Sequence, residues 1–217
     1  MYQATDKFLK LLKKTIQREF NYLSVHSFDE LNVVQTSNGL KDMFFRLLGF
    51  NKEQYLILAK EAHDYGLQTL NQEEKDQEGK VKFSEDEMVE YVLANYNRIT
   101  GYLYEKEAER KRLRLSEEIL TAREFLDRTL FSKSLKRGAN LWYTQSMQYA
   151  IDIEDHTLLT TYERAGVEKV QWVAEKDERT CNVCMKLDGK VFGINEVPGK
   201  THYNCRCYII PYRGKNS

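Results

Sequence analysis

Proline is almost absent from this sequence of 217 residues, and its two prolines, Pro198 and Pro211, both lie near the C-terminal end. Residues 1–197 therefore lack the residue that most strongly breaks helices. An excess of charge is missing too, because Lys plus Arg and Asp plus Glu both number 33. No net charge is available to drive binding to nucleic acid or to an anionic membrane surface. The composition favours a mainly α, globular protein.

Long hydrophobic runs are also missing. No apolar stretch approaches the roughly 20 residues that a membrane-spanning helix needs. Lysines interrupt the apolar segment 8–14 near the N-terminus, whereas the central region of a signal peptide is continuously apolar. We therefore expect neither membrane insertion nor secretion.

Three short helices are predicted in the first 70 residues. An amphipathic helix is indicated where apolar residues recur every four positions from Phe8 to Phe20. Ser27–Glu30 matches a capping box, which marks a second helix start. Asn51 offers a similar start for a third. Behind it lies an apolar face made of Tyr55, Leu58, Ala59, Ala62, Gly66 and Leu70.

The middle of the chain reads as a linker followed by long helical segments. Residues 71–82 contain a single apolar residue and predict an exposed loop or hinge. A capping box at Ser84–Glu87 then marks the start of a helical segment that continues to residue 137, either unbroken or divided near Gly101. We interpret the mixed charges of segment 105–137 as a solvated face rather than a nucleic-acid surface. A final helix is predicted from Ala139 to about Arg164, with Gly166 as its C-terminal cap.

The pattern changes after Gly166. Residues 167–174 alternate β-branched and aromatic residues with polar ones, as a strand does. An Asp188-Gly189 turn precedes a short strand at 190–192, and residues 207–210 form another strand candidate. We therefore predict a mainly α protein: a helical body over residues 1–166, then a small β-containing, zinc-knuckle-like module over residues 167–217.

Cysteine is absent from the first 180 residues, and all four cysteines lie between positions 181 and 207. The pattern is Cys181-x2-Cys184, 17 intervening residues, then His202-x2-Cys205-x-Cys207. Zinc prefers four thiolate or imidazole ligands in a tetrahedron, and a C-x2-C turn brings two sulfurs to one ion. The spacing predicts one structural zinc per chain. The ligands are either Cys181, Cys184, His202 and one of the last two cysteines, or all four cysteines.

Two other interpretations of the cysteines remain open. In one of them, Cys181 and Cys184 form a redox dithiol, although the βαβ context typical of such motifs is missing. In the other, Cys205 or Cys207 is a catalytic nucleophile paired with His202, although closeness in sequence does not establish a nucleophile–base geometry. The remaining histidines, His26, His63 and His156, are isolated from the cysteines and from one another.

A family resemblance emerges from these same residues. It comprises Trp172, the segment DERTCNVC at 177–184, LDGKVF at 187–192 and HYNCRC at 202–207. In this order they resemble the C-terminal motifs of the phage head morphogenesis family, the Mu F-like minor head or minor capsid proteins. Just before His202 the sequence departs from the usual pattern, because Gly199-Lys200-Thr201 stands where that family commonly has prolines.

The resemblance implies a non-enzymatic minor component of the virion. Such a protein is made in the host bacterial cytoplasm, joins the phage head during capsid assembly, and associates with the portal, scaffold or other capsid proteins. Some relatives influence DNA packaging or ejection. The zinc would fit this role physically, because a module of this size buries too little apolar surface to fold without added stabilisation.

Two other functions remain as alternatives. A nucleic-acid-binding zinc protein would need a basic face formed by Lys186, Lys190, Lys200, Arg206 and Arg213, and its DNA affinity would fall steeply with salt. A thiol-dependent enzyme or toxin would lose activity, but keep its fold, when Cys205 or Cys207 is replaced by serine. No catalytic residue is assigned.

Overall fold

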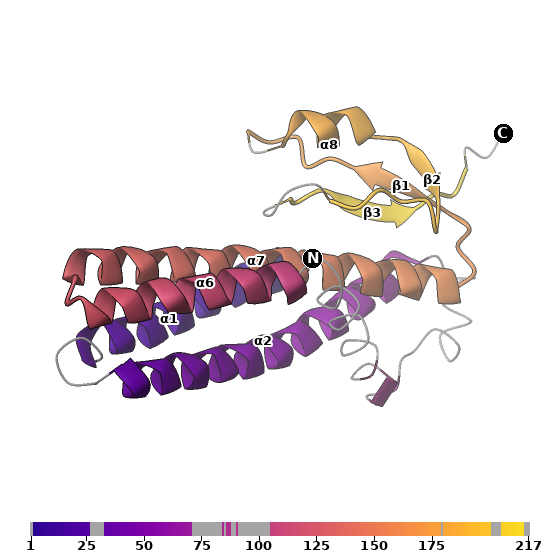
Figure 1. Cartoon of the computed structure of the whole chain (residues 1–217). Coiled ribbons are helices and arrows are strands. Elements are labelled where there is room, and N and C mark those ends of the chain that lie inside the picture. The colour runs from indigo at the N-terminus through magenta and orange to yellow at the C-terminus, as the bar shows by residue number, and fades with distance from the viewer. Residues whose placement is uncertain are drawn as a thin grey trace. The chain divides into compact units, whose positions relative to one another are not determined.

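The computed structural model describes residues 2–26, 33–70, 84, 86–87, 90, 105–178, 180–200 and 205–214. Over these residues the protein is mainly α with a small C-terminal β-sheet, which confirms the predicted fold class (Figure 1). The predicted Ser27 capping box, the hinge at 71–82 and the break near Gly101 lie outside the described residues. No helix in the described ranges combines the length and hydropathy that crossing a membrane requires.

The chain divides into two compact units. Unit 1 comprises Met1–Thr5, Tyr55–Leu93 and Gln148–Ser217; unit 2 comprises Asp6–Gln54 and Ala94–Met147. The predicted domain boundary at residue 166 stays a prediction, and the two compact units are divided at other positions in the chain. The C-terminal module falls in one unit with the ends of two long helices, because those helices supply part of its core.

Unit 2 contains most of α1 (Tyr2–His26), from Asp6 onward, and this helix is amphipathic as predicted. Its buried face holds the side chains that recur at helical spacing, and their exposed fractions are 5% or less: Phe8, Leu12, Ile16, Phe20 and Leu23. A buried carboxylate on the same helix, Glu19, accepts hydrogen bonds from Nε and Nη2 of Arg46 at 3.0 and 2.7 Å. This ion pair joins α1 to α2 (Val33–Thr69).

The predicted helix start at Asn51 is wrong, because α2 runs unbroken from Val33 to Thr69. Asn51 is 3% exposed, and its Nδ2 donates to Ser146 Oγ at 2.8 Å. Its amide therefore makes a buried contact between helices instead of capping one. The apolar face predicted behind it is confirmed, since every member from Tyr55 to Leu70 is buried.

The helical segment 105–164 is divided at a place that the sequence analysis missed. α6 (Glu105–Glu124) ends where Asp127 N donates to Ala122 O at 2.8 Å, with Leu126 in the left-handed region at φ 56°. The Asp127 carboxylate then caps α7 (Arg128–Arg164) by accepting from Leu130 N at 2.8 Å. The predicted start at Ala139 is therefore eleven residues late.

Two predicted helix termini are confirmed by their hydrogen bonds. Ser84 and Glu87 form the capping box, with Ser84 N donating to Glu87 Oε2 at 2.8 Å and Glu87 N donating to Ser84 Oγ at 3.2 Å. α7 ends at Arg164, and Gly166 follows in the left-handed region at φ 80°. Val167 N donates to Tyr162 O at 3.0 Å, which completes this C-terminal cap.

The C-terminal sheet has three antiparallel strands in the order β2-β1-β3. Its central strand β1 (Lys169–Val173) pairs with β2 (Val191–Gly193) and with β3 (Tyr208–Pro211), close to the predicted positions. One face is buried and includes Val170, Trp172 and Ile209, whose exposed fractions are 2% or less. This face packs against Leu158 and Tyr162 of α7.

Candidate metal centre

The first half of the candidate site is a single turn of helix. Cys181 is the N-cap of α8 (Asn182–Leu187), and its Sγ accepts a hydrogen bond from Cys184 N at 3.4 Å. Within that turn, Cys184 faces inward and is 2% exposed. The C-x2-C spacing therefore places one sulfur at the helix start and the second one turn later, on the inner side.

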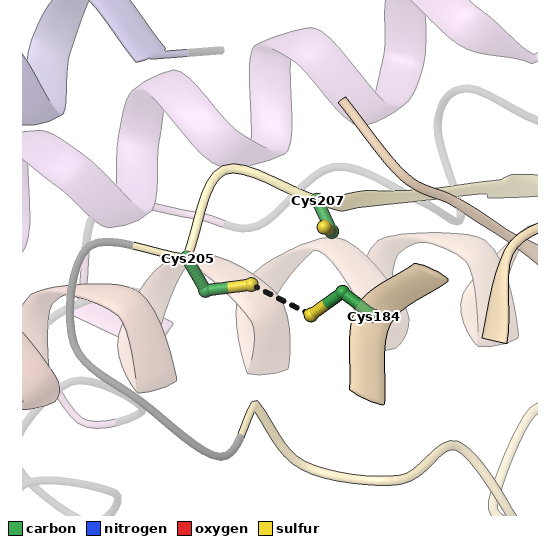
Figure 2. A group of neighbouring side chains, drawn as sticks. All are labelled: Cys184, Cys205 and Cys207. Atoms are coloured by element: carbon green, nitrogen blue, oxygen red, sulfur yellow. Dashed lines mark hydrogen bonds between the residues drawn. The ribbon is translucent and has the colours of Figure 1, made fainter. Parts of the chain in front are cut away.

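The second half is the extended segment that leads into β3. Cys205 and Cys207 are 4% and 2% exposed, and their sulfurs meet that of Cys184 (Figure 2). The three Sγ atoms lie within 4.8 Å of one another, and the Cys184–Cys205 pair is 3.5 Å apart. No disulfide joins any of the four cysteines, all of which the structure describes.

This sulfur cluster has the spacing that a tetrahedral metal needs. A Zn–S bond of about 2.3 Å in a tetrahedron separates two sulfurs by about 3.8 Å, close to the 3.5 Å between the Cys184 and Cys205 sulfurs and below the 4.8 Å within which all three lie. Burial raises the pKa of the Cys184 and Cys205 thiols, so their thiolates need a compensating positive charge. A divalent metal ion would supply that charge, and the three cysteines are placed so that they could hold one.

The structure brings together three of the five predicted ligands. Cys184, Cys205 and Cys207 form the cluster, and Cys181 is partly exposed beside Cys184. His202 lies outside the described residues. The complete ligand set thus stays a prediction, with Cys181 and His202 as the candidates for a fourth position.

An ion pair connects the two halves of the site. Arg206, between the two clustered cysteines, pairs through Nη2 with the Asp177 carboxylate. Asp177 also accepts from Thr180 Oγ1 at 3.1 Å, in a turn directly before Cys181. Asp177 and Arg206 of the sequence motifs therefore have a structural role, because they hold the C-x2-C turn against the C-x-C segment.

The LDGK motif fixes the end of the central strand. Asp188 accepts from Ala174 N at 2.9 Å and pairs with Lys176 Nζ at 2.8 Å. The hydrogen bond from Lys176 is the largest cause that lowers the pKa of Asp188. Gly189 has φ 74°, which favours glycine, and its N–H donates to Trp172 O at 2.8 Å. This turn therefore directs the chain, as it leaves α8, alongside β1.

A buried ion pair attaches the segment before the cysteines to α7. Lys200 Nζ lies 2.6 Å from Asp155 Oδ1, and the two side chains are 2% and 16% exposed. Burial alone would lower the pKa of Lys200, but Asp155 offsets this and the pKa is raised. Its charge also favours the Cys205 thiolate. Sequence reasoning missed this pair, because a lysine in a Gly-Lys-Thr loop gives no sign of burial.

The other predicted positions lie away from the cluster. His63 is 5% exposed on α2, and its Nδ1 is 2.8 Å from Thr161 Oγ1. His156 is on the exposed side of α7. Of the proposed basic face, Lys200 is buried in its ion pair, and Arg213 Nη2 donates to Thr69 O at 2.9 Å.

Comparison with known proteins supports the resemblance over the same region. Residues 121–210 match the family described as Phage Mu protein F like protein. The match covers 90 of the 217 residues, including α7, the sheet except Pro211 of β3, and the cysteine cluster. It confirms the resemblance to the Mu F-like family drawn from the motifs between Trp172 and Cys207. No curated protein and no solved structure matches the chain significantly.

Proposed function

We propose that this chain is a phage head morphogenesis protein: a non-enzymatic, low-copy component of the virion that acts through protein contacts. Its partners are the portal and other head, capsid or scaffold proteins, and it is incorporated while the head assembles in the bacterial cytoplasm. The observation that carries this proposal is the Mu F-like match over residues 121–210.

The cysteine cluster is proposed to hold one structural Zn²⁺ per chain. The all-sulfur environment favours a thiophilic ion over Mg²⁺ or Ca²⁺, which prefer oxygen ligands. When bound, the ion would cross-link α8 to the segment before β3 and add folding free energy to a module whose described residues form three short strands. Cys184, Cys205 and Cys207 would be ligands, with Cys181 or His202 completing the tetrahedron.

A structural role for the cysteines is favoured over a catalytic one by their burial. Reactive cysteines are partly exposed and lie in surroundings that lower the thiol pKa. Cys205 and Cys207 are at most 4% exposed, so a substrate has no access to either sulfur in this conformation. Protein contacts are favoured over nucleic-acid binding, because Lys200 and Arg206 are already engaged by carboxylates.

Assembly of phage heads tests the proposed function. In a phage that encodes this chain, deleting the gene should reduce the yield of filled heads, and supplying the chain from a plasmid should restore it. The purified heads should contain the chain in a few copies, together with the portal, as measured by quantitative mass spectrometry. Normal heads without the chain would refute the proposal.

Metal analysis tests the zinc centre separately. The full chain, purified without chelator, should contain one zinc per molecule and show thiols that react only after chelation. A Cys205→Ser, Cys207→Ser double variant should lose the zinc, whereas Val183→Ser on the exposed side of α8 should retain it. Freely reactive thiols and no zinc in the wild-type chain would refute the metal centre while leaving the head-assembly test unaffected.

A further inference from the structure

A buried hydrogen-bond donor lies beside the sulfur cluster. Trp172 is 1% exposed, and its indole Nε1 has no hydrogen-bond partner among the described residues. Leaving such a group unsatisfied is costly, and most buried polar groups in proteins are hydrogen-bonded. The indole N–H therefore lacks an acceptor at hydrogen-bonding geometry among the described residues.

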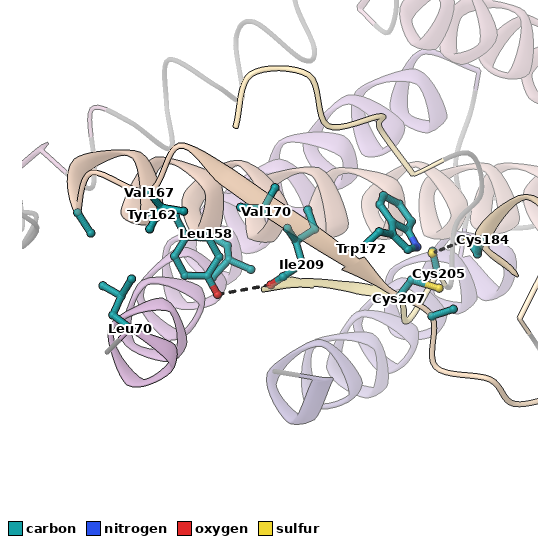
Figure 3. Packing of buried hydrophobic residues seen from close by; sticks show 12 residues of the cluster. Leu70, Leu158, Tyr162, Val167, Val170, Trp172, Cys184, Cys205, Cys207 and Ile209 are labelled. Atoms are coloured by element: carbon teal, nitrogen blue, oxygen red, sulfur yellow. Dashed lines mark hydrogen bonds between the residues drawn. The ribbon is translucent and has the colours of Figure 1, made fainter. Parts of the chain in front are cut away.

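Strand register places Trp172 on the same face of the sheet as Cys207, which lies one residue before β3. Trp172 is directly opposite Ile209 across the β1–β3 pair, and Cys207 precedes Ile209 by two residues. In an antiparallel pair, such diagonal neighbours share one face and are within reach of an aromatic side chain. Figure 3 shows the nitrogen edge of the indole ring directed toward the cysteine sulfurs.

We propose that the Trp172 indole N–H donates a hydrogen bond to a thiolate of the metal-bound cluster, which makes Trp172 a positioning residue of the site. This inference rests on the metal centre proposed above. A metal-bound thiolate keeps negative charge and lone pairs, and hydrogen bonds to charged acceptors are among the strongest in proteins. The acceptor is Cys205 or Cys207, the two cysteines of the segment that leads into β3.

The proposed bond has two consequences for the site. It stabilises the thiolate against protonation, so the metal should stay bound to a lower pH. It also orients the sulfur, as the partners of metal ligands commonly do. Removing such a partner typically weakens metal binding by about 10–100-fold. The tryptophan of the sequence motif thus acquires a polar function in addition to its packing in the core.

The two tryptophans of the chain allow a matched experiment. A Trp142→Phe variant leaves Trp172 as the sole tryptophan and should bind Zn²⁺ as the wild type does, because Trp142 lies outside the C-terminal module. In that background, biosynthetic replacement of tryptophan by 3-benzothienylalanine removes the N–H at nearly constant ring size. Zn²⁺ affinity is measured by competition with a chelating indicator, and zinc release is followed during acidification.

The expected result is an affinity about 10–100-fold lower in the benzothienyl protein. A tenfold loss moves the pH of zinc release upward by about 0.3 when three thiols are protonated together. The absorption of the Co²⁺-substituted protein should also change in its thiolate-to-metal charge-transfer bands. Val170→Ala controls for packing: it lowers stability on the same buried face but should leave the cobalt spectrum unchanged.

The outcomes separate this inference from the proposal beneath it. If the wild-type chain binds no metal, the metal centre and the hydrogen bond are both refuted. If the wild type binds zinc and the benzothienyl protein matches it in affinity, release pH and cobalt spectrum, the hydrogen bond alone is refuted. A shift that Val170→Ala reproduces would assign Trp172 to packing and overturn the inference.

Discussion

The buried ion pair between Lys200 and Asp155 yields the sharpest test of how the C-terminal module is attached to α7. Replacing Lys200 with methionine keeps much of the side-chain volume and removes the positive charge. The Asp155 carboxylate then loses the ammonium group that lies 2.6 Å from it, while its side chain stays largely buried. Breaking one partner of a buried pair typically costs about 3–5 kcal/mol. Because Asp155 is 16% exposed and partly hydrated, we expect a loss near the lower limit, about 3 kcal/mol.

A double-mutant cycle measures this interaction. Lys200→Met, Asp155→Leu and the double variant are unfolded with urea at pH 7, with Trp172 fluorescence in a Trp142→Phe background as the signal of unit 1. The double variant should lose less stability than the sum of the single variants, by at least about 2 kcal/mol, because neither charge is left unpaired.

Lys176→Met provides the matched control. Lys176 pairs with Asp188 at a similar distance of 2.8 Å, but its side chain is 61% exposed. Exposed pairs contribute little to stability and weaken with salt, so this variant should differ little from the wild type in 1 M salt. Our explanation is wrong if Lys200→Met costs no more than Lys176→Met, or if the two single losses simply add.

Three further predictions concern pH, close packing and helix capping. Burial raises the pKa of Asp152 from 3.8 to about 6; stability from this group is therefore present below pH 3.8 and lost as the pH rises through about 6. At pH 7 the free energy of unfolding of Asp152→Asn should exceed that of the wild type by about 2 kcal/mol, after allowance for partial exposure, and near pH 3.5 the two should be equal. An equal gain at both pH values would contradict this explanation. A Cβ at Gly66 would lie 2.9 Å from Thr161 Cγ2, whereas a Cβ at Gly49 would have nothing within 4 Å. Gly66→Ala should therefore lower the free energy of unfolding by about 1 kcal/mol, and Gly49→Ala should raise it by a similar amount. Equal effects of the two variants in urea unfolding would refute the packing argument. Asp127→Ala should cost about 1 kcal/mol by removing the cap of α7, while Asp127→Asn, which can still accept from Leu130 N, should cost clearly less in thermal unfolding.

Local patterns in the sequence were sufficient for the elements that depend on local chemistry. The amphipathic spacing from Phe8 to Phe20 predicted α1, and Gly166 predicted the end of α7. The Ser84–Glu87 box was also correct, because a capping box is made entirely by two residues three positions apart. Each of these features needs only near neighbours along the chain.

The same kind of reasoning failed where a distant contact decides the outcome. Asn51 is a good helix-capping residue, but it is buried in α2 because Ser146 of α7 offers its amide a partner. The break before α7 was missed because its left-handed position is occupied by Leu126 rather than by glycine. Asp127 was the available signal, since an aspartate before a run of helix formers is a common N-cap.

For the candidate site, the sequence by itself determined which atoms are present and how they are grouped: four cysteines and one histidine in two halves, flanked by turn residues. Ligand chemistry depends on residue type and short spacing, and both can be read from the chain. Only the tertiary structure decided that both Cys205 and Cys207 meet Cys184, that Arg206 pairs with Asp177, and that Lys200 is buried. These contacts join residues 21 to 45 positions apart, and they form because the sheet and α7 bury a common core, which no local pattern encodes.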